Sequence, residues 1–261
     1  MALTLHGTVS DNTAVLSRPN AKPLIINGDM NIAQRATSVT GHTGGGITTL
    51  DRWRFDVNTL GTWTIAQTAS GPGDTGLTNS FRVDCTTADA SPAAGDYAIY
   101  GTRLEGQDVQ LFKKGTSYAE KMTVSFWVKS NKTGTYIMEI DDNDNARNIN
   151  QAYTISSADT WEKKVLTFAG DTTGAFGNDN GDSLRLLWWL GSGSNFSSGS
   201  LQTAWAGTDN TKRAVGNVNV GDNTANDWSI TGIQMEVGEY DATTIPSFQH
   251  ESFDENLRRC Q

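Results

Sequence analysis

The stretch Met122-Thr-Val-Ser-Phe-Trp-Val-Lys129 alternates between apolar and polar side chains. Because successive side chains of a β-strand point to opposite faces, this period of two predicts a half-buried strand. The two predicted faces are Met122, Val124, Phe126 and Val128 on one side, and Thr123, Ser125, Trp127 and Lys129 on the other. Such a strand is typical of a β-sandwich, in which each sheet buries one face.

Similar segments recur along the chain, separated by turns rich in Gly, Asn, Asp and Pro. The predicted strands are Leu24–Ile26, Asp51–Phe55, Trp63–Gln67, Phe81–Cys85, Tyr97–Leu104, Tyr136–Ile140, Asn148–Ile155, Trp161–Phe168, Leu184–Leu190 and Trp228–Val237. Leu184–Leu190 is apolar on both faces and is expected to be central, and Gly232 is expected to mark a bulge. Glu105–Phe112 and Asp254–Cys260 are the predicted short helices. Strands that follow one another without βαβ alternation predict an all-β, antiparallel β-sandwich.

Residues 1–23 differ from the rest of the chain, and residues 24–261 are expected to form one domain. The first stretch has apolar residues at Leu3, Leu5 and Val9 and ends with Pro19 and Pro23. Proline stiffens the chain and removes a hydrogen-bond donor, so a regular strand is not expected there. One interpretation is an extended N-terminal arm that contacts a neighbouring subunit or anchors the chain on a particle through these apolar residues. The other is an unstructured terminus.

Composition excludes two classes of partner. With 29 Asp and Glu against 20 Lys and Arg, the net charge is -9, and no cluster of basic residues is present to bind nucleic acid. No run approaches the roughly 18 apolar residues of a membrane span.

The N-terminus also lacks the pattern of a secretory signal. A protein of extracellular character without an export signal indicates release by cell lysis, as happens in bacteriophage infection.

No pattern of catalytic residues emerges from the sequence. His6, His42 and His250 lie in separate contexts, and the common hydrolase and nucleotide-binding motifs are absent. Cys85 and Cys260 lack the spacing of a zinc site or a disulfide framework. The many carboxylates allow a glycosidase pair in principle, but nothing marks one out. We therefore expect a protein that is not an enzyme.

The loop Asp141-Asp-Asn-Asp-Asn145 resembles the start of a calcium-binding loop. An EF-hand loop needs Gly at its sixth position and Glu at its twelfth. Here those positions are Ala146 and Ala152, so the match fails. An oxygen-rich hairpin turn is the better interpretation.

Trp127 is the candidate binding residue, because it lies on the polar face of its strand between Ser125 and Lys129. An exposed Trp ring on a sheet face can stack on the apolar face of a sugar. The alternative is that this face packs against a helix, a loop or another subunit, which is the usual fate of a large apolar patch.

Several segments, taken together, resemble a family of bacteriophage tail-fibre and virion-associated domains. They are Ile26–Arg35, Leu50–Arg54, Arg103–Gln107, Val124–Ser130, Ile230–Gly238, Phe248–Ser252 and Asn256–Gln261. That family is itself similar to carbohydrate-binding modules of the 4/9 type, which implies a jelly roll. In many related modules the first and last strands hold a structural calcium ion, for which Asp29 and Glu236 are the nearest candidates. Relatives often continue past Cys-Gln with Arg and aromatic residues, whereas this sequence ends at Gln261, which leaves the role of that tail open here.

The resemblance implies a non-enzymatic protein of the virion surface. The first hypothesis is a tail-fibre or receptor-binding protein that recognises a glycan of the host surface. The second is a capsid-decoration or head-fibre protein, for which residues 1–23 supply an anchor. A bacterial carbohydrate-binding module is the third. We expect contacts with other virion proteins and a homotrimer, because fibre tips and capsid threefold sites favour cyclic symmetry.

Overall fold

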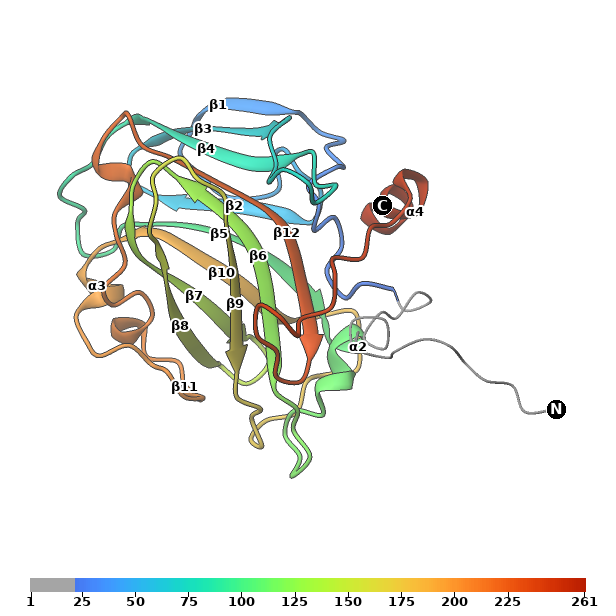
Figure 1. Cartoon of the computed structure of the whole chain (residues 1–261). Helices are drawn as coiled ribbons and strands as arrows, with labels where there is room; N and C mark the ends of the chain where they lie inside the picture. Colours follow the sequence, from blue (N-terminus) through green and yellow to red (C-terminus); the bar gives the residue numbers. More distant parts are fainter. Residues whose placement is uncertain (1–21) are drawn as a thin grey trace.

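Two antiparallel sheets of six strands each pack face to face in the computed structural model, which describes residues 22–261 (Figure 1). Sheet A has the strand order β1-β3-β4-β12-β6-β9, and sheet B has the order β11-β8-β7-β10-β5-β2. The strands are β1 (Ser38–His42), β2 (Trp53–Asn58), β3 (Thr62–Thr68), β4 (Ser80–Thr87), β5 (Tyr97–Glu105), β6 (Met122–Ser130), β7 (Gly134–Asp142), β8 (Arg147–Ile155), β9 (Glu162–Phe168), β10 (Asp182–Ser192), β11 (Ala206–Gly207) and β12 (Asp227–Val237). The predicted antiparallel β-sandwich is thus confirmed.

Helices are short and lie at the ends of the sandwich. They are α2 (Gly106–Val109), α3 (Ser194–Ser197) and α4 (Phe253–Cys260), with 3-10 turns at Gln110–Phe112, Asn210–Lys212 and Val220–Asp222. The predicted helix over Glu105–Phe112 is therefore one α-turn followed by a 3-10 turn, which ends where Lys113 adopts a φ of 51°. The predicted C-terminal helix is also confirmed. No helix within residues 22–261 is long and apolar enough to cross a membrane.

The strand Met122–Ser130 lies between β12 and β9 in sheet A, as its alternation requires. On its β12 side the register shifts between Thr231 and Gln234, and Gly232 has a φ of 62°. A Cβ at Gly232 would lie 2.5 Å from a methyl group of Leu77, so both conformation and space require glycine there. The predicted bulge is confirmed.

Aromatic side chains fill the space between the sheets. Tyr100 is at their centre, with ring centroids 4.2 Å from Phe81, 5.1 Å from Trp53 and 5.7 Å from Trp228. All four residues are almost completely buried. Such rings bury large apolar areas and prefer the offset and edge-on contacts seen here. Strand β10 is internal in sheet B, as its apolar character on both faces predicts.

The prediction of a strand at Leu24–Ile26 is wrong. These residues form bends and a turn. The chain turns here because Asn27 adopts a φ of 55°, and the Asn27 side chain makes hydrogen bonds to nearby backbone groups. The Asn27 amide donates to the carbonyl oxygens of Ile32 and Asp51 at 2.9 Å and 3.0 Å. Strands β1 and β11 were not predicted from the sequence.

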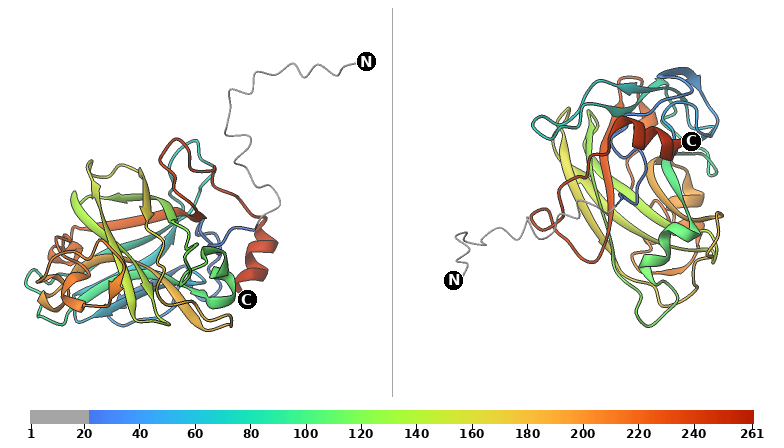
Figure 2. Two further views of the ribbon diagram at one scale, coloured as in Figure 1. Left: turned by 90° about the horizontal axis from the view of Figure 1, so that it is seen from below. Right: turned by 90° about the vertical axis from the view of Figure 1, so that its right-hand side faces the viewer.

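The described N-terminal segment lies beside α4, although more than 200 residues separate them in the sequence (Figure 2). The Asn256 side chain accepts from the Asn27 backbone N–H at 3.1 Å and donates to Asp29 at 3.0 Å. Lys22 pairs with Glu255 at 2.8 Å. We call these contacts the terminal clasp. Leu3, Leu5 and Val9 lie outside the described residues, so the anchoring arm stays a prediction.

Candidate functional site

A groove runs over the outer face of sheet B across β2, β5 and β10. It consists of two hollows of about 180 Å³ and about 270 Å³ that share Arg54 and Arg103. We call it the sheet B groove. Its lining residues include Ile47, Arg52, Arg54, Asp56, Tyr97, Ile99, Arg103, Asn180, Asp182, Arg185, Leu187, Trp189, Phe196 and Arg213.

Part of the groove floor is apolar. Tyr97 and Ile99 point outward from β5, and Leu187 and Trp189 lie beside them on β10. Gly101 is paired with Leu187 across the two strands, and a Cβ at Gly101 would lie 2.8 Å from a Leu187 methyl group. The absence of a side chain at Gly101 therefore leaves room for Leu187 in the floor.

One wall is held in place by a buried ion pair. Glu139 on β7 accepts from Trp189 Nε1 and from Arg213 Nε, both at 2.8 Å. The Arg213 guanidinium lies 5.4 Å from the Trp189 ring centroid, and Phe196 of α3 packs on the same ring at 5.3 Å. Burial raises the pKa of Glu139, while the charge of Arg213 acts in the opposite direction. These contacts fix the indole, so the wall has one defined shape.

The rim of the groove alternates between guanidinium groups and carboxylates. Arg54 donates to both oxygens of Asp56 at 2.6 Å and 2.7 Å. Arg185 donates to Asp182 through two nitrogens at 2.9 Å and 2.8 Å, and Arg103 lies 3.1 Å from the same Asp182 oxygen. Hydrogen-bond donors and acceptors are therefore both available along the rim, next to an apolar floor.

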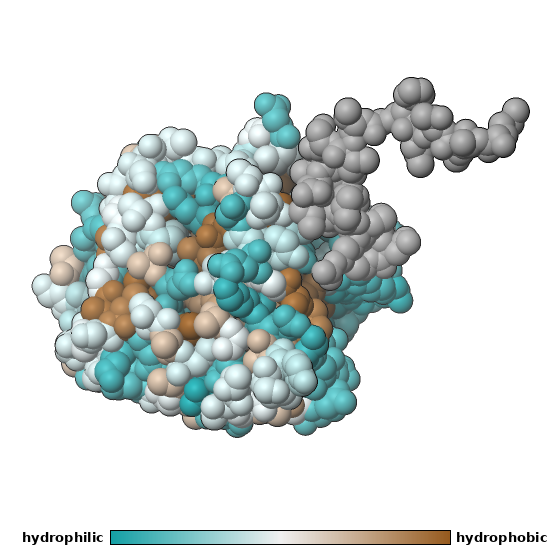
Figure 3. All heavy atoms as spheres, turned by 60° about the horizontal axis from the view of Figure 1, so that its bottom comes forward, coloured by the Kyte–Doolittle hydropathy of each residue, from teal (hydrophilic) through white to brown (hydrophobic). Residues whose placement is uncertain are grey.

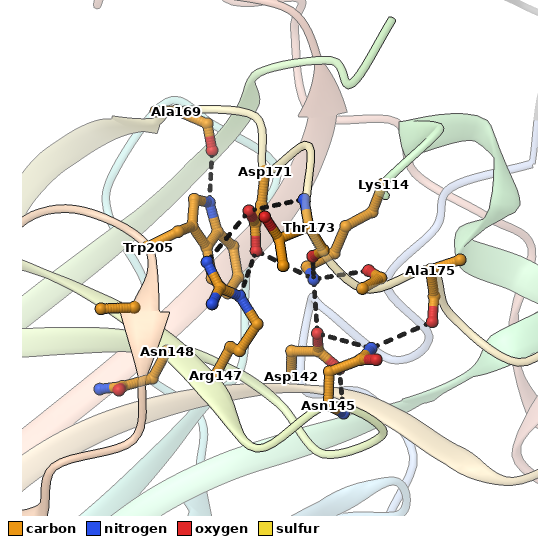
Figure 4. A network of polar contacts seen from close by, with 12 residues as sticks. Lys114, Asp142, Asn145, Arg147, Asn148, Ala169, Asp171, Thr173, Ala175 and Trp205 are labelled. Carbon is orange, nitrogen blue, oxygen red and sulfur yellow. Dashed lines mark hydrogen bonds and ion pairs between the residues drawn. The ribbon is translucent and has the colours of Figure 1, made fainter. Parts of the chain in front are cut away.

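A second polar cluster surrounds the side chain of Lys114 (Figure 4), which is completely buried. Its ammonium lies 2.5 Å from Asp142 and 3.1 Å from Asp171, and it donates to the carbonyl oxygens of Thr173 and Gly174 at 2.8 Å. We call this arrangement the lysine cage. Two carboxylates and two carbonyls are the kinds of oxygen that bind Ca²⁺ in proteins, but here the cation is a lysine.

Further contacts surround the lysine cage on other sides. Arg147 donates to Asp171 at 2.7 Å, and Asn145 donates to Asp142 (Figure 4). Burial acts to raise the pKa of Asp171, but the hydrogen bonds from Arg147 and its other partners outweigh it, so this pKa is lowered. The predicted oxygen-rich loop at Asp141–Asn145 is thus the last two residues of β7 and the start of the turn to β8, and Asp142 and Asn145 contribute to this cluster.

A wider hollow of about 580 Å³ lies beside the lysine cage, lined by residues that include Lys113, Tyr118 and Phe176. Tyr118 is 77% exposed and Leu111 is 42% exposed. Figure 3 shows a face on which apolar residues form separate patches among polar ones. The lining of this hollow combines the rings of Tyr118 and Phe176 with the polar side chains of Gln110, Lys113 and Thr116, and it lacks the arginine-carboxylate pairs of the sheet B groove.

The three residues of β6 that were predicted to bind a ligand differ in how far they are buried. Ser125 is 1% exposed, and a ligand role for its hydroxyl stays a prediction. Its partner on β12, Gln234, donates to the carbonyl oxygen of Pro246 at 2.8 Å, which ties the segment after β12 to this strand.

Trp127 and Lys129 remain half-buried on the outer face of sheet A. The Lys129 ammonium lies 5.2 Å from the ring centroid of Trp161, a cation–π contact with a residue just before β9. A ligand role for Trp127 and Lys129 stays a prediction.

The two candidate calcium residues are placed differently. Asp29 is buried, and its oxygens accept from Asn31 at 2.6 Å and from Asn256 at 3.0 Å, as part of the terminal clasp. Glu236 lies on β12 opposite Thr123. Within residues 22–261, no group of three or more His, Cys, Asp or Glu side chains is arranged to hold a metal ion.

The sheet B groove was not predicted, although four of its five arginines, Arg52, Arg54, Arg103 and Arg185, lie in predicted strands. The sequence feature that could have pointed to the groove is Arg185, a charged residue inside the apolar run Leu184–Leu190. Arg103 belongs to another strand, and pairing of β5 with β10 brings the two together as direct neighbours. Neither residue indicates the groove without that pairing.

Comparisons with solved structures find distant matches. The enzymatically active domain of tailspike protein 4 of bacteriophage CBA120 matches 82% of this chain with 11% identity and a TM-score of 0.43, and this chain spans 21% of that protein. A putative sugar-binding protein from Bacteroides thetaiotaomicron matches 83% of this chain and 100% of its own, with 15% identity and a TM-score of 0.43. The xylan-binding domain CBM22-2 from Paenibacillus barcinonensis Xyn10C matches 82% and 99%, with 12% identity and a TM-score of 0.37.

The sequence matches no protein-family model and no curated protein. The structural matches are distant, and none of them assigns a ligand to this chain. The residues of the sheet B groove are therefore the basis for any functional proposal.

Proposed function

We propose that this chain is a non-catalytic glycan-binding protein and that the sheet B groove is its binding site. The observation that carries the proposal is the combination of an apolar floor at Ile99 and Leu187 with a rim of paired arginines and carboxylates. A sugar ring has apolar C–H faces and hydroxyl groups that both donate and accept hydrogen bonds. Binding pockets for such ligands combine apolar walls with a few well-placed polar groups.

Binding without bond cleavage is favoured by the state of the carboxylates at the rim. A glycosidase needs two carboxyl groups that act on the substrate as proton donor and as nucleophile or base. In the sheet B groove, Asp56 and Asp182 accept hydrogen bonds from Arg54 and Arg185. Both oxygens of Asp56 and one oxygen of Asp182 are thus engaged in holding the rim together, and the other Asp182 oxygen is buried.

The binding test compares two tyrosines on a glycan array and by titration calorimetry. Tyr97→Ala removes an aromatic wall of the sheet B groove, and we expect affinity to fall about tenfold. Tyr118→Ala removes an exposed ring from the 580 Å³ hollow and serves as the control. If Tyr118→Ala weakens binding and Tyr97→Ala does not, the site is the hollow and the groove assignment is wrong. A wild-type protein that binds no glycan would reject the proposed function.

We further propose that the protein acts on the surface of a bacteriophage particle, supported by the sequence resemblance to virion-associated domains. Many copies on one particle convert weak single-site binding into firm attachment through high effective concentration. Antibody labelling of intact particles tests this location. Label on the tail supports a receptor-binding role, and label on the head favours the capsid-decoration alternative. Unlabelled particles would contradict a virion location and favour a bacterial carbohydrate-binding module.

A further inference from the structure

The sheet B groove contains an unusual share of the chain's arginines. Although the net charge is -9, five of the eleven arginines in the sequence line the groove. They are Arg52, Arg54, Arg103, Arg185 and Arg213. The planar guanidinium group presents a fork of N–H donors that matches carboxylate, sulfate or phosphate oxygens, which an ammonium group does not.

Three of these five arginines are fully engaged by carboxylates of the protein. Arg213 donates to buried Glu139, and Arg54 makes a bidentate contact with Asp56. Arg185 donates twice to Asp182. These three therefore shape the groove and have little hydrogen-bonding capacity left for a ligand.

Arg103 and Arg52 are different, because their own partners are weak or shared. The contact of Arg103 with Asp182 at 3.1 Å is to the oxygen that Arg185 already uses. Arg52 lies 4.0 Å from Glu105, and its Nε is buried without a hydrogen-bond partner. The Arg103 and Arg52 side chains are 44% and 37% exposed. Both line the 270 Å³ hollow, so two partly free guanidinium groups face the same space.

Both arginines and carboxylates surround Arg103, and Glu105 and Asp182 line the same hollow. Burial lowers the pKa of Arg103, and the positive charges of Arg54 and Arg185 lower it further, against the attraction of Asp182. An anion bound here would offset that repulsion. Arg52 also has a φ of 70°, a conformation that costs energy for a non-glycine residue and is often found at functional sites. Thr102 stabilises it by donating to the Arg52 carbonyl at 2.8 Å.

We propose that the sheet B groove selects acidic glycans, with the negatively charged substituent bound between Arg52 and Arg103. The sugar rings extend from there over Ile99 and Leu187 into the 180 Å³ hollow. Each hollow alone is smaller than the roughly 300 Å³ of a typical ligand site, so the continuous groove suits an oligosaccharide better than a single sugar. This proposal rests on the proposed function and specifies its ligand class.

The test uses a panel of uronate-bearing and sulfate-bearing oligosaccharides, each with its neutral counterpart made by methyl esterification or desulfation. We expect wild-type protein to bind an acidic member at least about tenfold more tightly than its neutral form. Arg103→Gln and Arg52→Gln should each lower affinity for the acidic form much more than affinity for the neutral form, so that the ratio of the two affinities falls towards one. Comparison of the uronate-bearing with the sulfate-bearing oligosaccharides identifies which anion is bound.

Arg82→Gln is the matched control, because Arg82 lies on β4 of sheet A and is also paired with aspartates, Asp84 and Asp227. It should leave both affinities unchanged. Equal binding of acidic and neutral forms, still weakened by Tyr97→Ala, would overturn the acidic preference and leave the proposed function intact. Binding of no member, acidic or neutral, would overturn both. Melting temperatures of the variants show whether each one is folded.

Discussion

At the scale of single residues, the lysine cage joins three separate parts of the chain through one ammonium group. Lys114 follows the 3-10 turn Gln110–Phe112, Asp142 ends β7, and Asp171 begins the loop after β9. Because the side chain is completely buried, its charge depends on these oxygens in place of water. The cage therefore holds the loop at Thr173 and Gly174 against the end of the sandwich.

Lys114→Met is expected to lower the free energy of unfolding by about 3–5 kcal/mol, because it leaves Asp142 buried without its cation. Urea denaturation measures this loss. Lys113→Met is the control, since Lys113 is 53% exposed and pairs with exposed Glu120, and we expect a change below about 1 kcal/mol. Similar losses for the two variants would show that the cage is not specifically required.

At the scale of elements, helix α4 depends on polar contacts more than on apolar burial. Asn256 is its only buried residue. Ser252 caps the N-terminus, with Asp254 and Glu255 in the first turn and Arg258 and Arg259 in the last, which suits the helix dipole. An eight-residue helix is marginal by itself, so its position depends on the terminal clasp.

Asn256→Ala should release α4 from the sandwich. The substitution removes the acceptor of the Asn27 N–H and one of the side-chain donors to the buried Asp29 carboxylate, at a cost of about 1–3 kcal/mol. Amide hydrogen exchange should become faster in α4 and in residues 24–32, while β6 and β10 stay protected. Asn178→Ala, at an exposed loop position, should change nothing. Unchanged exchange in α4 after Asn256→Ala would mean that other contacts hold the helix.

Much of the strand pattern was predictable because side-chain alternation is a local property. Met122–Lys129 and Leu184–Leu190 lie in β6 and β10 as expected. Leu24–Ile26 was mistaken for a strand because the side-chain hydrogen bonds of Asn27 involve residues distant in the sequence. Buried Ser125 is likewise paired with Gln234 of β12, more than 100 residues away in the sequence, which alternation within β6 does not reveal.

At the scale of the whole molecule, the two outer faces have different characters. Sheet B carries the groove, whereas sheet A carries the half-buried Trp127 and Trp161 near its edge strand β9. The groove was not predictable from the sequence, since it needs β2, β5 and β10 side by side. An assembly through the tryptophan side of sheet A would leave every groove open to a ligand.

We expect the protein to form a homotrimer that uses this side of sheet A. Light scattering should then give three times the chain mass of 28.2 kDa. Trp161→Ser should reduce the measured mass to that of one chain and leave glycan affinity per site unchanged. Tyr118→Ser, at an exposed ring elsewhere, should keep the trimer. A wild-type mass of one chain at micromolar concentration would contradict the trimer.

The terminal clasp has a consequence for how such a domain is reused. Pro23 accepts a hydrogen bond from Arg259 at 2.6 Å, so the described ends of the chain leave the sandwich at the same corner. Domains with neighbouring ends can be inserted into, or exchanged between, host proteins without disturbing either partner. Recombination between genomes could therefore transfer the sandwich as one unit, with its groove intact and a single point of attachment.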